Sequence, residues 1–147
     1  MIKIVTEVEI NRSSDEVFAY ISNFENNPQW QSGQISAEFT SDGPLRVGST
    51  YDQIAKFLGR TIVSQFEVVE YDPGHMVKAS TTSGSFPITF TRIVEPSGEG
   101  AAVKAIVEGD SSGFFKLAEP LMARMVQRSV DADYQNLKRI MEQGPYA

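Results

Sequence analysis

The spacing of apolar positions changes along this chain between a period of two and a period near 3.6 residues. Residues 2–10 alternate, with Ile4, Val8 and Ile10 on one face and charged side chains on the other, which predicts a strand. Residues 34–109 repeat this alternation between turn signals, whereas residues 120–143 carry apolar side chains at helical steps. The order predicts an α+β protein in which one sheet is covered by one long helix.

Two short helices are expected directly after the first strand. Ser13 and Glu16 fit the Ser-x-x-Glu pattern of a capping box, in which each residue bonds the other's backbone amide. The apolar stripe of this first helix consists of Val17, Phe18, Ile21 and Phe24. Pro28 pushes Asn27 out of the helical region, so the first helix has ended by then, and Pro28 can start a second, one-turn helix that carries Trp30.

Six further strands are expected between residues 34 and 109, separated by turns rich in Gly, Pro, Asp and Ser. Their predicted ranges are 34–41, 49–58, 61–71, 75–82, 86–95 and 101–109. Most of the connections suit hairpins, so we expect a strongly curved antiparallel sheet with one apolar face.

The last part of the chain is predicted to be a long amphipathic helix over residues 120–143. Its apolar positions are Phe114, Ala118, Leu121, Met125, Val126, Val130, Tyr134, Leu137 and Met141, of which the first two precede the main helix. Pro120 cannot donate to the Lys116 carbonyl, so residues 113–119 are expected to form a separate turn or a kinked lead-in. Spacing alone does not decide whether the row of Leu121 or the neighbouring row of Met122 faces the sheet.

Composition narrows the class of protein. The chain has 147 residues with 41% hydrophobic and 22% charged content, which is typical of one soluble globular domain spanning residues 1–147. Cysteine is absent, so disulfides and thiolate chemistry are excluded. The net charge of −6 and the dispersed basic residues argue against nucleic-acid and membrane partners, and residues 1–10 lack the apolar core of a signal peptide. We expect a cytoplasmic monomer or homodimer.

Several short motifs at turns and core positions point to a known family. They occupy residues 10–18, 27–30, 47–49, 59–60, 69–74 and 137–142. With them the chain resembles, over essentially its whole length, the START-like or Bet v 1-like (SRPBCC) superfamily, and within it the polyketide cyclase/dehydrase and lipid-transport group. One departure is Gly100-Ala101, where the family usually has Gly-Thr. The resemblance implies a helix-grip fold: a curved seven-stranded antiparallel sheet wrapped around a long C-terminal helix, with two short helices after the first strand.

The resemblance also implies a cavity between sheet and helix, and the strands agree with it because several apolar-face positions are aromatic or polar. The candidate ligand-binding residues are Trp30, Tyr51, Gln53, Phe57, Ser64, Phe66, Phe90, Arg92, Leu117, Leu121, Met122 and Met125. An apolar pocket with a few polar groups is the usual form of a small-molecule site. A one-residue register error would place any strand residue on the other face. Arg92 inside a cavity would select a carboxylate or a phenolate, whereas a bulge or strand end would place it in solvent.

The sequence offers no convincing catalytic set and no metal or cofactor site. His75 follows the turn Asp72-Pro73-Gly74 and is expected to be a solvated turn residue. We therefore expect the protein to bind a small hydrophobic or amphipathic molecule, such as a lipid or a polyketide-like aromatic. Two alternatives remain open. One is a cyclase or dehydratase in which Tyr51, Arg92 or His75 polarises a carbonyl; the other is a protein-binding module with a vestigial cavity.

Overall fold

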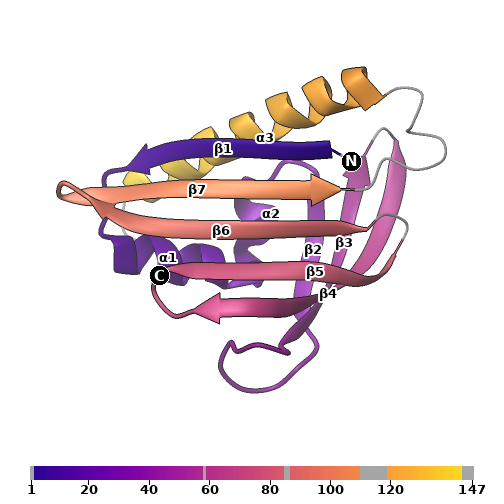
Figure 1. The fold of residues 1–147 in the computed structure, drawn as a ribbon, viewed down its shortest axis with the longest axis horizontal. Coiled ribbons are helices and arrows are strands. Elements are labelled where there is room, and N and C mark those ends of the chain that lie inside the picture. Colours follow the sequence, from indigo (N-terminus) through magenta and orange to yellow (C-terminus); the bar gives the residue numbers. More distant parts are fainter. Residues whose placement is uncertain (1, 58, 85–86, 110–118, 144–147) are drawn as a thin grey trace.

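The elements of the chain follow the predicted order in the computed structural model, which describes residues 2–57, 59–84, 87–109 and 119–143 (Figure 1). The elements are β1 (Ile2–Ile10), α1 (Ser14–Ser22), the 3-10 turn η1 (Phe24–Asn26), α2 (Asn27–Trp30), β2 (Gln34–Phe39), β3 (Thr50–Phe57), β4 (Arg60–Asp72), β5 (Met76–Gly84), β6 (Ile88–Ser97), β7 (Gly100–Gly109) and α3 (Glu119–Glu142). The turn η1 is the one described element that the sequence did not predict.

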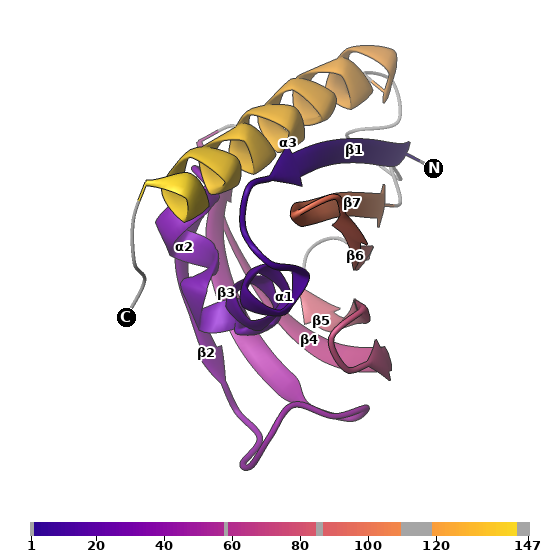
Figure 2. The same cartoon turned by 90° about the vertical axis from the view of Figure 1, so that its left-hand side faces the viewer.

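The seven strands form one antiparallel sheet in the order β1-β7-β6-β5-β4-β3-β2. Every neighbour pair is sequential except β1 with β7, so the first strand lies beside the last. Figure 2 shows the sheet curling from β1 round to β2, with α3 lying across its open side and α1 and α2 at one end. This arrangement is the helix-grip fold, as predicted.

Alternation along the strands determines which side chains enter the interior. On β1, Ile4, Thr6, Val8 and Ile10 are buried and the residues between them are exposed. On β6, the buried residues are Phe90, Arg92 and Val94. No register shift interrupts the pairing of β6 with β7, so Arg92 keeps its inward position and is only 3% exposed. The interior alternative for Arg92 is therefore the observed one.

The predicted turns also form. Ser13 caps α1 by accepting a hydrogen bond from the Glu16 amide, with its Oγ 3.2 Å from that nitrogen. Gly74 has φ +80° in the turn between β4 and β5, a conformation that favours glycine, and the His75 amide donates to the Asp72 carbonyl oxygen at 3.0 Å. The turn sets the β4–β5 register as far as Glu70, where the first of two register shifts begins.

The side chains of α3 that face the sheet differ in part from the predicted apolar stripe. The row that faces inward is Met122, Val126, Val130, Tyr134, Leu137 and Met141. Leu121 is 62% exposed and Met125 is 38% exposed, because the steps of four that lead back from Tyr134 arrive at Met122 and leave these two on the outer side. Their predicted interior position was wrong. Residues 113–118 of the predicted lead-in, including Leu117, lie outside the described residues.

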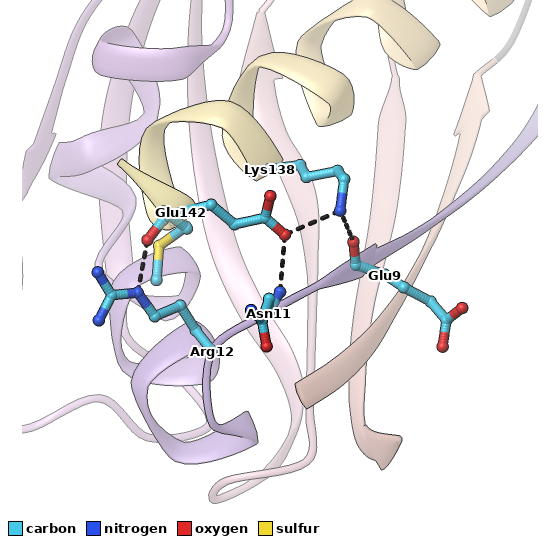
Figure 3. A network of polar contacts seen from close by, with 6 residues as sticks. Glu9, Asn11, Arg12, Lys138 and Glu142 are labelled. Atoms are coloured by element: carbon cyan, nitrogen blue, oxygen red, sulfur yellow. Dashed lines mark hydrogen bonds and ion pairs between the residues drawn. The ribbon is translucent and has the colours of Figure 1, made fainter. Parts of the chain in front are cut away.

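The C-terminal end of α3 is tied to the junction between β1 and α1 (Figure 3). Glu142 accepts hydrogen bonds from the Asn11 backbone amide and from Lys138 Nζ, both at 2.8 Å. Lys138 Nζ also donates to the Glu9 carbonyl oxygen, and Arg12 Nε donates to the Met141 carbonyl oxygen, at 2.7 Å each. These bonds satisfy a carbonyl of the last helical turn and fix where the helix ends.

We expect Glu142→Gln to destabilise the protein at pH 7 and to have little effect near pH 3. The hydrogen bond from Lys138, then the one from Asn11, hold the pKa of Glu142 below its usual range. A carboxyl whose pKa is lower in the folded state stabilises above its unfolded pKa, near 4.3, and loses that contribution as the pH falls through the folded pKa. Because the group is exposed, the expected loss is only about 1 kcal/mol. Urea unfolding of the wild type and of Glu142→Gln between pH 3 and pH 7 measures the difference in stability. A loss of stability that persists at pH 3 would contradict its assignment to the ionised carboxylate.

Candidate functional site

A cavity of about 430 Å³ lies between the concave face of the sheet and the first half of α3. Figure 1 shows the elements that frame it: the start of β1, the end of β7, the β3–β4 hairpin and the orange part of α3. Its apolar lining comes mainly from Ile2, Ile4, Phe57, Ile62, Ile88, Val107, Met122, Val126 and Val130. The size and the largely apolar lining are those of a small-molecule pocket.

The uncharged polar residues of the sheet in this lining are Gln34, Gln53 and Ser64. Gln53 on β3 and Ser64 on β4 are direct partners in the strand register, so they stand side by side on the concave face. Ser64 is only 4% exposed. Neither side chain has a hydrogen-bond partner within the part of the chain that the structure describes. The polar groups of the cavity floor are therefore available to whatever occupies it.

A polar wall faces them from the loop after α2 and from α3. Asp133 of α3 accepts hydrogen bonds from the backbone amide and the Oγ of Ser32, both at 3.1 Å. Burial raises the pKa of Asp133, and the two bonds from Ser32 partly oppose that rise. One turn further, Asn136 Nδ2 donates to the Trp30 carbonyl oxygen at 3.1 Å. These contacts hold the loop against the helix and close one side of the cavity.

Arg92 lies deeper in the interior, in an aromatic box at the other half of the sheet. Its guanidinium carbon is 4.8 to 5.6 Å from the ring centroids of Phe24, Trp30 and Phe90. Nη1 donates to the Ile21 carbonyl oxygen at 2.8 Å and to Asn27 Oδ1 at 3.0 Å. The charge thus has carbonyl dipoles and ring faces around it, and none of the described carboxylates forms an ion pair with it.

Two tyrosines complete this buried cluster. Burial raises the pKa of the Tyr51 hydroxyl and that of Tyr134, while Arg92 nearby acts in the opposite direction on both. The Tyr51 and Phe66 rings stack with centroids 5.1 Å apart, and the Trp30 and Tyr134 rings meet edge to face at 4.8 Å. Arg92 Nε, Tyr51 OH and Trp30 Nε1 are sealed from solvent with no hydrogen-bond partner among the described residues. Both hydroxyls remain protonated at neutral pH.

The predicted site residues divide between these two regions. Gln53, Phe57, Ser64 and Met122 line the cavity. Trp30, Tyr51, Phe66, Phe90 and Arg92 face inward but belong to the packed aromatic cluster and do not line it. Leu121 and Met125 are on the outer face of α3, and Leu117 lies outside the described residues. The sequence predicted which side chains of these strands point inward. It did not distinguish the residues that line the cavity from those in the packed aromatic cluster.

Sequence reasoning missed several lining residues. Ile62 and Ile88 lie on the same alternation as Ser64 and Phe90, so one further step along each strand would have found them. Gln31 and Gln34 carry no pattern that marks them, because the turn after α2 brings them to the cavity. Asp133 was not among the predicted site residues, because its place in the wall depends on Ser32, 101 residues away. His75, one of the three residues considered for polarising a carbonyl, is in the turn before β5. Its ring Nδ1 is 3.2 Å from the Val94 carbonyl oxygen, and it does not line the cavity.

Other kinds of site receive no support from the residues described. No cluster of three or more His, Cys, Asp or Glu in ranges 2–57, 59–84, 87–109 and 119–143 is arranged to hold a metal ion. Within the same ranges no helix has the length and apolar character that crossing a bilayer requires.

Comparison with solved structures places this fold among known proteins. TTHA0849 from Thermus thermophilus superposes with a TM-score of 0.81 at 17% identity, covering 95% of this chain and 96% of that one. A START superfamily protein from Mycobacterium smegmatis also gives 0.81, at 15% identity and with 97% and 99% covered. The major latex-like protein 151 from Panax ginseng gives 0.62 at 17% identity, with 88% and 95% covered. Identities this low show a shared fold.

A search of curated protein sequences finds no match. The sequence does match the family described as polyketide cyclase / dehydrase and lipid transport, over residues 1–142. With its helix-grip sheet, its cavity under the long helix and this match over nearly its whole length, the chain belongs to the polyketide cyclase / dehydrase and lipid transport family.

Proposed function

We propose that the protein binds a small hydrophobic or amphipathic molecule, for transport or sequestration, in the cavity between the sheet and α3. The observation that carries this proposal is the cavity of about 430 Å³ with a mostly apolar lining. At ~25 cal/mol per Å² of apolar area, enclosing roughly 200 to 300 Å² of ligand contributes on the order of 5 to 8 kcal/mol before the costs of association. Micromolar affinity is consistent with that range.

The arrangement of ionisable groups favours binding over catalysis. Of the three residues considered for polarising a carbonyl, Tyr51 and Arg92 are in the packed cluster and His75 is in the β4–β5 turn. A general acid or base must come within hydrogen-bond reach of the substrate, and a ligand in the described cavity does not meet these three. Asp133, the carboxylate of the cavity wall, accepts both hydrogen bonds from Ser32 on Oδ1, and these bonds hold it against the loop.

The test is a fluorescence titration with the apolar probe N-phenyl-1-naphthylamine. We expect saturable uptake of one probe per chain with a blue-shifted emission, and displacement by naphthalene, because both molecules are apolar and small enough for the cavity. Non-saturable uptake, or emission that stays at its value in water, would contradict the proposal. Native mass spectrometry of the purified protein then shows whether a molecule is retained from the expression host.

A further inference from the structure

The polar pair on the cavity floor carries information about the chemistry of the ligand. Gln53 and Ser64 face each other across β3 and β4, with Tyr51 and Ala55 flanking Gln53 on one strand and Ile62 and Phe66 flanking Ser64 on the other. The pair is thus a polar island on an inward face that is otherwise mainly apolar.

The Ser64 hydroxyl makes no hydrogen bond to the described residues, so it contributes none to folding. Alanine at position 64 would suit an apolar floor at least as well. Departures from such local rules concentrate at functional sites. Unlike Tyr51 OH, neither the Gln53 amide nor the Ser64 hydroxyl is sealed inside the protein, and both residues line the cavity, so a bound molecule can reach them.

Gln53 and Ser64 would select a ligand by its hydrogen-bond donors and acceptors. A glutamine amide and a serine hydroxyl each both donate and accept, and a ligand hydroxyl is the small group that matches both roles at once. Charge is a poor match. Of the two charged residues in the lining, Asp133 disfavours an anion, and Lys56 is exposed at an outward position of β3. Arg92, the cation that would attract a carboxylate, is outside the lining.

Resting on the proposed function, we propose that Gln53 and Ser64 bind the hydroxyl of a neutral amphipathic ligand, an alcohol or a phenol whose apolar body fills the rest of the cavity. The hydroxyl donates to one side chain and accepts from the other. The body then lies against Ile62, Ile88 and Met122 on the two sides of the cavity.

The experiment measures dissociation constants by displacement of N-phenyl-1-naphthylamine for naphthalene, 2-naphthol, 2-methoxynaphthalene and 2-naphthoate. The proteins are the wild type, Ser64→Ala, Gln53→Met and the control Thr61→Ala, which changes an exposed hydroxyl three residues from Ser64 on β4. We expect 2-naphthol to bind most tightly to the wild type. Its advantage over naphthalene should shrink roughly fivefold in each floor variant and stay unchanged in Thr61→Ala.

Each outcome separates the two proposals. Suppose that naphthalene displaces the probe but the affinity of 2-naphthol relative to naphthalene is the same in Ser64→Ala and Gln53→Met as in the wild type. That result overturns the hydroxyl assignment and leaves the proposed function intact. Tighter binding of 2-naphthoate or 2-methoxynaphthalene than of 2-naphthol overturns it as well. If no probe binds saturably, both the hydroxyl assignment and the proposed function are overturned. Folding does not confuse the result, because Ser64→Ala removes no hydrogen bond to the described residues and should melt close to the wild-type temperature.

Discussion

Arg92→Ala is expected to lower the free energy of unfolding by about 3 to 5 kcal/mol, which is the largest loss we predict for a single change. The substitution leaves the Ile21 carbonyl and Asn27 Oδ1 without the donor that holds them, inside a region closed to water. It also leaves empty volume between the rings of Trp30, Phe90 and Phe24. Since those contacts join α1 and α2 to β6, the short helices should loosen from the sheet. Denaturant unfolding followed by tryptophan fluorescence reports on Trp30 directly.

The matched control is Lys104→Ala, which removes an exposed cation from the neighbouring strand β7. Its effect should stay within about 0.5 kcal/mol, the range of ordinary surface changes. If Arg92→Ala lowers the free energy of unfolding by less than about 1 kcal/mol, the guanidinium does not hold the short helices to the sheet.

Met122→Trp should abolish uptake of N-phenyl-1-naphthylamine while costing less stability than overpacking normally does. Met122 is 6% exposed, and its side chain lines the cavity. A larger side chain there enters open space, so the expected cost is below the ~1 to 3 kcal/mol of an overpacked core, and the indole occupies the volume that a ligand needs. Thermal melts and probe titrations of the same preparations measure both quantities.

Leu121→Trp is the control one residue away. Leu121 is 62% exposed on the outer face of α3, so the same increase in volume should change neither the melting temperature nor the probe affinity by a measurable amount. Strong destabilisation by Met122→Trp, together with unchanged probe uptake, would mean that the probe binds elsewhere.

The sequence predicted the fold because alternation and turns are local signals that the sheet leaves unchanged. Ile4, Val8 and Ile10 alternate on β1 as expected, and the caps and turns at Ser13 and Gly74 form with the residues that predicted them. Alternation also put Arg92 on the inward face, which is one of the two alternatives that the sequence left open and the one observed. It could not say how far along the curved sheet the packed half ends and the cavity begins, because that depends on contacts between strands and helices distant in sequence.

The helix and the loop show two other limits. Leu121 and Met122 are adjacent and both apolar, so spacing could not choose between their rows until the packing of Tyr134, Leu137 and Met141 fixed the rotation of α3. The loop 31–33 has no periodicity, and its place at the cavity follows from the bond between Ser32 and Asp133, which are 101 residues apart.

The most direct test of the central claim is a crystal structure of the protein grown with 2-bromonaphthalene, whose bromine gives an anomalous signal. We predict one strong peak between α3 and the β3–β4 hairpin, in contact with Met122 and Ile62. A peak only on the outer surface, or none in crystals of a protein that takes up the apolar probe in solution, would contradict the claim that this cavity is the binding site.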